Sequence, residues 1–276
     1  MVGGGRIRRS VIAGSWYPGT VDVLEGTVTR YLGNVEPMEL TGDLLGLIVP
    51  HAGYVYSGQV AAHAYRQLED ISFDRVVVVC PVHRMSVGQY GVVDADYYET
   101  PLGLVEIDAQ WVDALACEVT MSRVLRDSEH SLEIQLPFLQ HMLGEFKLLP
   151  IMMGDQSQES CRILAEALVQ VMGDERALLV ASTDLSHFCR YSVALQLDGV
   201  VQEHVQKFDP EGLAGALAAH RCEACGGGPM VTVMLAARSM GAGKAVVLKY
   251  ANSGDVTGDH SQVVGYLAAA ICRSSG

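Results

Sequence analysis

Three of the nine histidines in the 276-residue chain follow short apolar segments. His51 comes after LLGLIVP, His83 after VVVVCPV, and His187 after LLVASTDLS, a segment that also carries Asp184. Imidazole nitrogens are good ligands for iron, copper, zinc and nickel, and a third ligand would leave positions open for a substrate. A further histidine that holds no metal has a pKa near neutral pH and suits general acid–base chemistry. The pattern favours one shared polar site over three unrelated structural histidines.

The residue types alone leave the third ligand open. Four residues are candidates: Asp184, Asp255, Glu129 and Cys225. Glu129 belongs to the segment DSEHSLE, in which His130 and Glu133 lie three residues apart and would share one helix face. His130 could equally brace its own helix, and Asp255 in GDVTGD could be an ordinary turn residue.

Short apolar runs are the elements that must position these side chains. Runs such as VVVVC are typical of strands buried on both faces of a sheet. Six strands are predicted at residues 45–49, 76–80, 148–153, 178–181, 245–248 and 263–270. Helical patterns occupy residues 58–68, 111–117, 132–143, 157–172, 195–208, 211–219 and 230–240. Residues 90–106 have strand composition interrupted by Thr-Pro and Gly, which predicts a hairpin-like excursion near a sheet edge.

Strands that alternate with helices predict an α/β fold, a three-layer sandwich around a largely parallel or mixed sheet. Ligands of such sheets bind beyond the carboxyl ends of the strands, where the histidines above are expected. No repeat, linker or low-complexity segment divides the sequence, so a single domain over residues 1–276 is expected.

The composition excludes several classes of protein. Hydrophobic residues make up 49% of the chain and charged residues 18%, a balance that supports a folded core rather than disorder. No apolar run approaches the roughly 18 residues of a membrane span, and the first residues lack the apolar stretch of a secretory signal. The net charge of −13 disfavours nucleic acid as a partner. Seven scattered cysteines favour a reducing cytoplasm, and the high apolar content would make a homo-oligomer unsurprising.

A set of motifs resembles the Memo family, which includes component B of the archaeal and bacterial AmmeMemoRadiSam system. The motifs occur in the order AGSWYPG, PHAGYVYSG, PVHRMSVG, EHSLEIQLPFL, STDLSHFCRY, a Cys-Gly pair before a proline-started helix, and SGDVTGDHSQVVGY. They span residues 9 to 270, and PHAGY and EHSLEIQLPFL are the most specific of them.

The resemblance implies a fold similar to that of class III extradiol dioxygenases, which open catechol rings with non-haem ferrous iron. Those enzymes hold iron with two histidines and a glutamate and use another histidine as acid and base. Carried onto this sequence, the resemblance implies three metal ligands: His51, His83 and Cys225. It also makes His187 the acid–base group, and we expect Asp184 to orient it.

A cysteine in place of the usual glutamate softens the metal site. We therefore expect Fe(II), with copper or zinc as alternatives. Three further residues are expected to contact the substrate: Tyr54, His130 and Arg84. Arg84 stands where some branches of the family carry a second histidine.

Two functions follow from the resemblance. The first is a metal-dependent oxidoreductase, dioxygenase-like, acting on an unidentified substrate. The alternative is a metal- or peptide-binding adaptor of the kind used in signalling, without turnover. The expected partners are a small-molecule or peptide ligand and, through gene association, a radical-SAM protein and an AMMECR-type protein.

Overall fold

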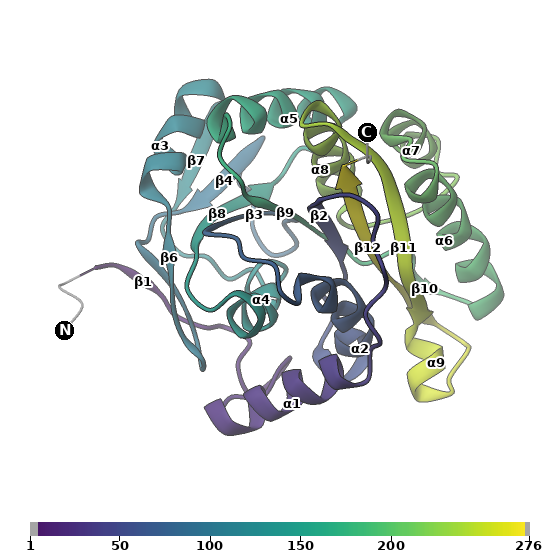
Figure 1. Cartoon of the computed structure of the whole chain (residues 1–276). Coiled ribbons are helices and arrows are strands. Elements are labelled where there is room, and N and C mark those ends of the chain that lie inside the picture. Colours follow the sequence, from purple (N-terminus) through teal and green to yellow (C-terminus); the bar gives the residue numbers. More distant parts are fainter. Residues whose placement is uncertain (1–4, 274–276) are drawn as a thin grey trace.

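A central sheet with a parallel core of strands runs through the protein (Figure 1). The computed structural model describes residues 5–273, and twelve strands of that part form the sheet. The parallel centre comprises, in spatial order, β6 (Gly103–Ile107), β8 (Lys147–Met153), β3 (Arg75–Pro81), β9 (Leu178–Ser182) and β2 (Leu44–Val49). These central strands include four of the six predicted from the sequence, which are confirmed.

Antiparallel strands extend the sheet beyond β2. There β12 (Val263–Arg273) pairs with β2, and both β11 (Ala242–Asn252) and β10 (His187–Cys189) pair with β12. The two long strands β11 and β12 contain the remaining predicted strands and continue them by several residues. The sheet is therefore mixed, as predicted.

The opposite end of the sheet holds the predicted hairpin. β5 (Tyr97–Thr100) pairs antiparallel with β6, and β1 (Ile7–Arg8) lies beyond β5. β4 (Tyr90–Val93) instead pairs with β8 and with β7 (Met121–Val124). The hairpin is thus the β5–β6 pair, with only β1 beyond it.

Helices cover both faces of the sheet and complete the predicted three-layer sandwich (Figure 1). One layer consists of α1 (Val21–Gly33), α2 (Tyr54–Tyr65) and α4 (Leu136–Leu143). The other consists of α3 (Ala109–Glu118), α5 (Gln158–Met172), α6 (Tyr191–Gln206), α7 (Pro210–Ala218) and α8 (Gly227–Ser239). Three short elements complete the chain: the 3-10 turns η1 (Arg66–Leu68) and η2 (Glu133–Gln135), and helix α9 (Ser253–Thr257).

Helix α1 was not predicted, although its buried residues Leu24, Val28 and Leu32 recur every fourth position. That spacing is the signal of an amphipathic helix, and the β-branched residues and Gly26 between them obscure it. None of the helices within residues 5–273 has both the length and the apolar composition that a bilayer span requires.

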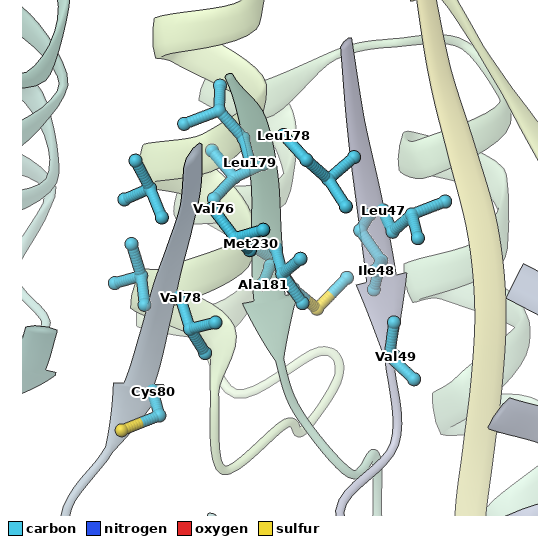
Figure 2. Packing of buried hydrophobic residues seen from close by; sticks show 14 of the residues in the cluster. Leu47, Ile48, Val49, Val76, Val78, Cys80, Leu178, Leu179, Ala181 and Met230 are labelled. Atoms are coloured by element: carbon cyan, nitrogen blue, oxygen red, sulfur yellow. The ribbon is translucent and has the colours of Figure 1, made fainter. Parts of the chain in front are cut away.

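The centre of the sheet is buried on both faces, which makes its strand ends rigid. Val76, Val78 and Leu47 lie in the core, and Met230 of α8 packs against them (Figure 2). Burying each such side chain contributes about 1.5–3 kcal/mol, so the ends of β2, β3 and β9 are fixed relative to one another.

Candidate metal centre

The carboxyl ends of three adjacent parallel strands bring the predicted polar residues together. His51 lies two residues after the end of β2, His83 two residues after β3, and Asp184 two residues after β9. The backbone N–H of His51 donates to Asp184 Oδ1 over 2.8 Å, and the rings of His51 and His83 have centroids 5.2 Å apart. The strand-end geometry predicted from the sequence is present.

A pocket of about 620 Å³ opens above these strand ends. Its lining includes five polar residues, His51, His83, His130, Asp184 and His187, and four aromatic ones, Trp16, Tyr56, Phe188 and Tyr266. The pocket therefore combines a cluster of titratable groups with a largely apolar wall.

Three histidines converge at this pocket. Ring nitrogens of His51, His83 and His130 all lie within 4.8 Å of one another, and among residues 5–273 this is the one trio of His, Cys, Asp or Glu with that spacing. His130, predicted to contact substrate, thus lies among the candidate ligands. Such a set of imidazoles suits iron, copper or zinc.

The surroundings of His51 select its tautomer. Ser182 Oγ donates to the Ser131 carbonyl over 2.5 Å, so the same oxygen accepts from His51 Nδ1 at 3.0 Å. Gln135 Nε2 also donates to Ser182 Oγ. His51 Nδ1 therefore carries the proton, and Nε2 keeps its lone pair for a cation.

Burial keeps His51 and His130 neutral. It holds the pKa of His51 well below the ordinary value, and the neighbouring histidines add to the effect. Burial also lowers the pKa of His130, to about 4, with His83 and Arg84 contributing. Because the neutral imidazole is the form that binds metals, these side chains are ready to act as ligands.

Cys225 reaches the cluster from a distant part of the chain. Its Sγ lies 3.1 Å from His51 Nε2, and its backbone N–H donates to the Asp184 carbonyl at 3.1 Å. Gly226 makes this approach possible, since a Cβ there would collide with the Ser182 carbonyl at the end of β9. Burial and Asp184 raise the pKa of the Cys225 thiol, so a cation would have to displace its proton.

Glu129 supplies a buried carboxylate beside the histidines. Its Oε1 accepts from the backbone N–H of His83 at 2.7 Å, while Oε2 has no hydrogen-bond partner among the described residues. Burial alone would raise its pKa, but His83 and the backbone N–H of Arg84 outweigh that effect and lower it. His130 Nδ1 is also unpartnered there. An orphaned, buried ring nitrogen next to imidazole and thiol donors fits a bound transition-metal ion.

Asp184, predicted to orient His187, makes its contacts elsewhere. Backbone N–H groups of His51 and Ala52 hold the Asp184 carboxylate, and no hydrogen bond or ion pair joins it to His187 within residues 5–273. Burial raises the pKa of Asp184 to about 7. His187 lines the pocket at the start of β10, and burial lowers its pKa.

Two predicted substrate contacts lie outside the pocket lining. Tyr54 is buried, its hydroxyl donates to the Ile134 carbonyl at 3.0 Å and its N–H donates to the Trp16 carbonyl, so these contacts show a packing role. Arg84 is exposed and lies over the ring of Trp16, 5.8 Å from its centroid. Contact of either residue with a substrate stays a prediction.

The remaining ligand candidate, Asp255, belongs to a helix cap. Its Oδ2 accepts from the Asn252 N–H at 2.8 Å within a capping box at the start of α9. Its Oδ1 accepts from the Tyr191 hydroxyl. These contacts give Asp255 a structural role, as a helix-capping residue rather than the turn residue considered from the sequence.

Sequence reasoning missed the part that Trp16 plays. Its ring lies 4.2 Å from that of His130, measured between centroids, and both residues line the pocket. The only local signal is a large aromatic residue in the Gly- and Pro-containing segment AGSWYPG. Ser182 was also missed, since nothing in LLVAST marks its serine as the partner of a histidine 131 residues away.

Comparison with known proteins identifies the family of the chain. The profile of the Memo-like protein family matches residues 8–270. A MEMO1 family protein of Methanosarcina mazei is 36% identical over 269 residues, covering 96% of this chain and 99% of the relative. One from Nitrosopumilus maritimus is 36% identical over 270 residues, covering 94% and 98%. The chain therefore belongs to the Memo family.

Proposed function

We propose that this Memo-family protein binds a redox-active metal ion, with Fe(II) as the expected metal, and acts as a dioxygenase-like oxidoreductase. The observation that carries the proposal is the convergence of His51, His83 and His130 within 4.8 Å at a pocket of about 620 Å³. Copper and zinc suit the same donors and are the alternatives.

His51 and His83 are ligands whether the third ligand is assigned from spacing or from the family resemblance. Spacing favours His130 as the third ligand, whereas the family resemblance favours Cys225, whose Sγ already contacts His51 Nε2. A thiolate ligand would make the site softer and more favourable to copper.

The bound metal would supply Lewis-acid and redox chemistry toward dioxygen. The protein's own groups do the rest. The apolar wall formed by Trp16, Phe188 and Tyr266 favours a flat substrate. His187, on the pocket wall and largely neutral, can take up and return a proton of that substrate.

Metal analysis of anaerobically purified protein tests the site. We expect one iron per chain and a loss of more than about 100-fold in affinity for His51→Ala, because a primary ligand disappears. His130→Ala and Cys225→Ser identify the third ligand, and only the true one should lower affinity comparably. With Co(II) as the probe, a thiolate ligand gives a charge-transfer absorption that Cys225→Ser removes. Unchanged metal content in His51→Ala would refute the assignment.

Turnover needs its own assay. Iron-loaded protein is screened for oxygen uptake with a panel of catechols and other small aromatic compounds, and His187→Ala serves as the comparison. We expect uptake that falls by about 10²–10⁴-fold in His187→Ala while iron affinity is retained. No uptake across the panel would favour a binding function.

One observation favours that second function, a binding protein without turnover. Val55, Tyr56 and Phe188 line the pocket and expose 72%, 45% and 70% of their surface. Phe188 has a φ of 57°, an uncommon backbone conformation for a phenylalanine, and it stays exposed. Such a rim suits a peptide ligand, and Phe188→Ala should then weaken peptide binding without changing metal content.

We also propose that the protein works in a reducing cytoplasm beside a radical-SAM protein and an AMMECR-type protein. All seven cysteines are free thiols, which supports the compartment. The partners rest on the family resemblance. Co-purification from the native organism tests them, and absence of both proteins from the recovered complex would count against this part of the proposal.

A further inference from the structure

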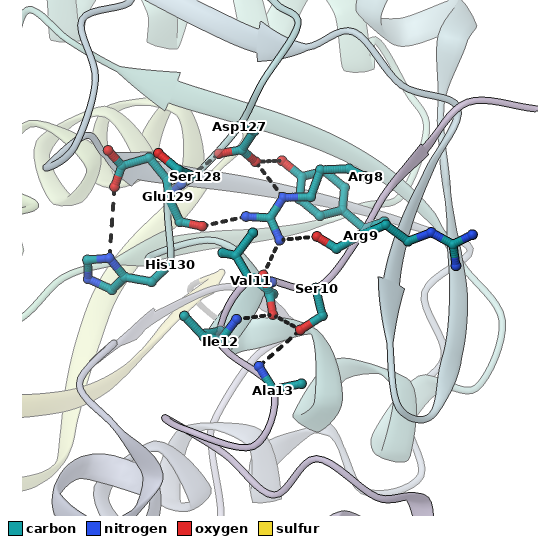
Figure 3. Close-up of polar contacts among 12 residues, drawn as sticks. Arg8, Arg9, Ser10, Val11, Ile12, Ala13, Asp127, Ser128, Glu129 and His130 are labelled. Atoms are coloured by element: carbon teal, nitrogen blue, oxygen red, sulfur yellow. Dashed lines mark hydrogen bonds and ion pairs between the residues drawn. The ribbon is translucent and has the colours of Figure 1, made fainter.

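Glu129 occupies an unusual place beside the histidine cluster. It lies in the loop between β7 and η2, next to His130, and its side chain is 1% exposed (Figure 3). His51 and His83 come from strand ends, whereas Glu129 belongs to this loop. A carboxylate buried this deeply requires partners for both of its oxygens.

One oxygen of Glu129 fastens the loop that follows β3. Oε1 accepts from the backbone N–H of His83 at 2.7 Å and from that of Arg84. These two bonds fix the backbone of His83 relative to Glu129. They also leave Oε1 saturated with donors, so the second oxygen must find its partner elsewhere.

That second oxygen points at imidazole nitrogens. Oε2 lies 3.5 Å from His83 Nδ1 and 3.9 Å from His130 Nδ1, and no other donor bonds to it among the described residues. His83 is the nearer of the two. An N–H on His83 Nδ1 is therefore the most accessible donor for Oε2.

The backbone of Glu129 is held so that its carboxylate stays in place. Its carbonyl accepts from the guanidinium of Arg8, and its N–H donates to Asp127 Oδ1 at 2.8 Å (Figure 3). Arg8 itself is buried and pairs with Asp127 Oδ2 at 2.9 Å. The segment is thus anchored on the side away from the pocket.

We propose that Glu129 is a positioning residue that keeps the proton of His83 on Nδ1 and so leaves Nε2 free for the metal. The inference rests on the proposed function for the presence of that metal. Ser182 performs the same task for His51, so the two shared ligands are oriented by different groups, one by a hydroxyl and the other by a carboxylate. A partner on the second ring nitrogen fixes the tautomer and raises the basicity of a ligating histidine.

Glu129→Gln gives a sharp test because it preserves the shape of the side chain. Its one remaining oxygen is needed by the N–H groups of His83 and Arg84. Its amide NH₂ then faces His83 Nδ1, which must accept, so the His83 proton moves to Nε2. We expect long-range ¹H–¹⁵N spectra of the metal-free full chain at pH 8 to show His83 as Nδ1–H in the wild type and Nε2–H in the variant. His51 should remain Nδ1–H in both.

Zinc affinity measured by calorimetry completes the test. We expect Glu129→Gln to weaken Zn²⁺ binding by 10- to 100-fold and the exposed control Glu118→Gln to leave it unchanged. A fall in affinity with an unchanged His83 tautomer would make Glu129 a direct ligand and overturn the proposal. An inverted tautomer with unchanged affinity would also overturn it, because His83 would then not need this orientation.

The spectra separate this proposal from the metal-centre proposal. If the wild type binds no metal at all, the proposed function fails, while the metal-free spectra still decide whether Glu129 controls His83. If Glu129→Gln does not fold, the wild-type spectrum alone is decisive. A wild-type His83 protonated at Nε2 would overturn the inference.

Discussion

The two sides of the pocket are built in different ways. On one side, His51, His83 and Asp184 follow buried parallel strands whose apolar residues hold them in place. On the other side, Trp16 and the Glu129–His130 segment lie on irregular backbone. The first side depends on hydrophobic packing, and the second on a buried polar network.

That network joins the N-terminal segment to the loop that carries His130. Glu133 accepts from the Arg8 guanidinium, from Ser10 Oγ at 2.5 Å and from the Tyr17 hydroxyl at 2.6 Å. It also accepts from the backbone N–H of Val11 at 2.9 Å. A fully buried carboxylate with this many donors fixes two loops against each other.

The difference shows how a fold compensates for irregular backbone. The core already restricts the backbone of strand ends in a packed sheet, so a polar partner such as Ser182 chiefly sets the orientation of a side chain there. A loop wall has no such core, and buried ionic groups specify its geometry at the cost of their desolvation. Single substitutions on the two sides should therefore differ in how much they lower the free energy of unfolding and the metal affinity.

Removing the charge of Glu133 should give the largest effect. Glu133→Gln leaves buried Arg8 partly uncompensated, so we expect the free energy of unfolding to fall by about 3–5 kcal/mol in urea denaturation. Glu159→Gln is the control, since it removes one exposed partner of Arg162 and should cost less than about 1 kcal/mol. A loss below about 1 kcal/mol for Glu133→Gln would show that the network does not hold this wall.

Ser182→Ala tests the strand-end side. It removes the partner of His51 Nδ1 and the donor to the Ser131 carbonyl, and it leaves Gln135 Nε2 with the Pro50 carbonyl as its acceptor. We expect a loss of about 1–3 kcal/mol in unfolding free energy, with metal affinity reduced about tenfold. The exposed Ser122→Ala is the matched control. Full metal affinity in Ser182→Ala would mean that packing alone orients His51.

Trp16→Ala tests the contact between the N-terminal segment and His130. Loss of the ring pair, whose centroids are 4.2 Å apart, should lower the free energy of unfolding by about 0.5–1.5 kcal/mol beyond the effect of the lost buried area, and it should shift the NMR signals of His130 while those of His51 stay in place. Trp16→Phe keeps an aromatic ring and should retain most of the stability and the His130 signals of the wild type. If the His130 signals do not move in Trp16→Ala, Trp16 does not support that ring.

The smallest change is expected for Asp255→Ala. This substitution breaks half of the capping box of α9 and should cost about 0.5–1 kcal/mol in thermal or urea unfolding. Metal content should not change, because Asp255 bonds to Asn252 and Tyr191. Loss of metal in this variant would indicate that Asp255 is a metal ligand.

Much of the fold could be predicted from the sequence. The strands at β2, β3, β8 and β9 appear as local apolar runs, and their buried centre confirms the prediction. Helix α8 begins at Gly227 rather than at residue 230, because glycines there allow close contact with Leu217 and Gln156. A run of glycines carries no helical periodicity, so this start could not be predicted.

The sequence alone determined that the central strands are buried and that His51, His83 and Asp184 follow them, because apolar runs and strand ends are local properties. Tertiary structure decided which other groups join them. Ser182 lies 131 residues from His51 along the chain, and Glu133 lies 125 from Arg8. Contacts over such separations depend on how the loops fold back over the sheet, and no local pattern of residue types encodes that path.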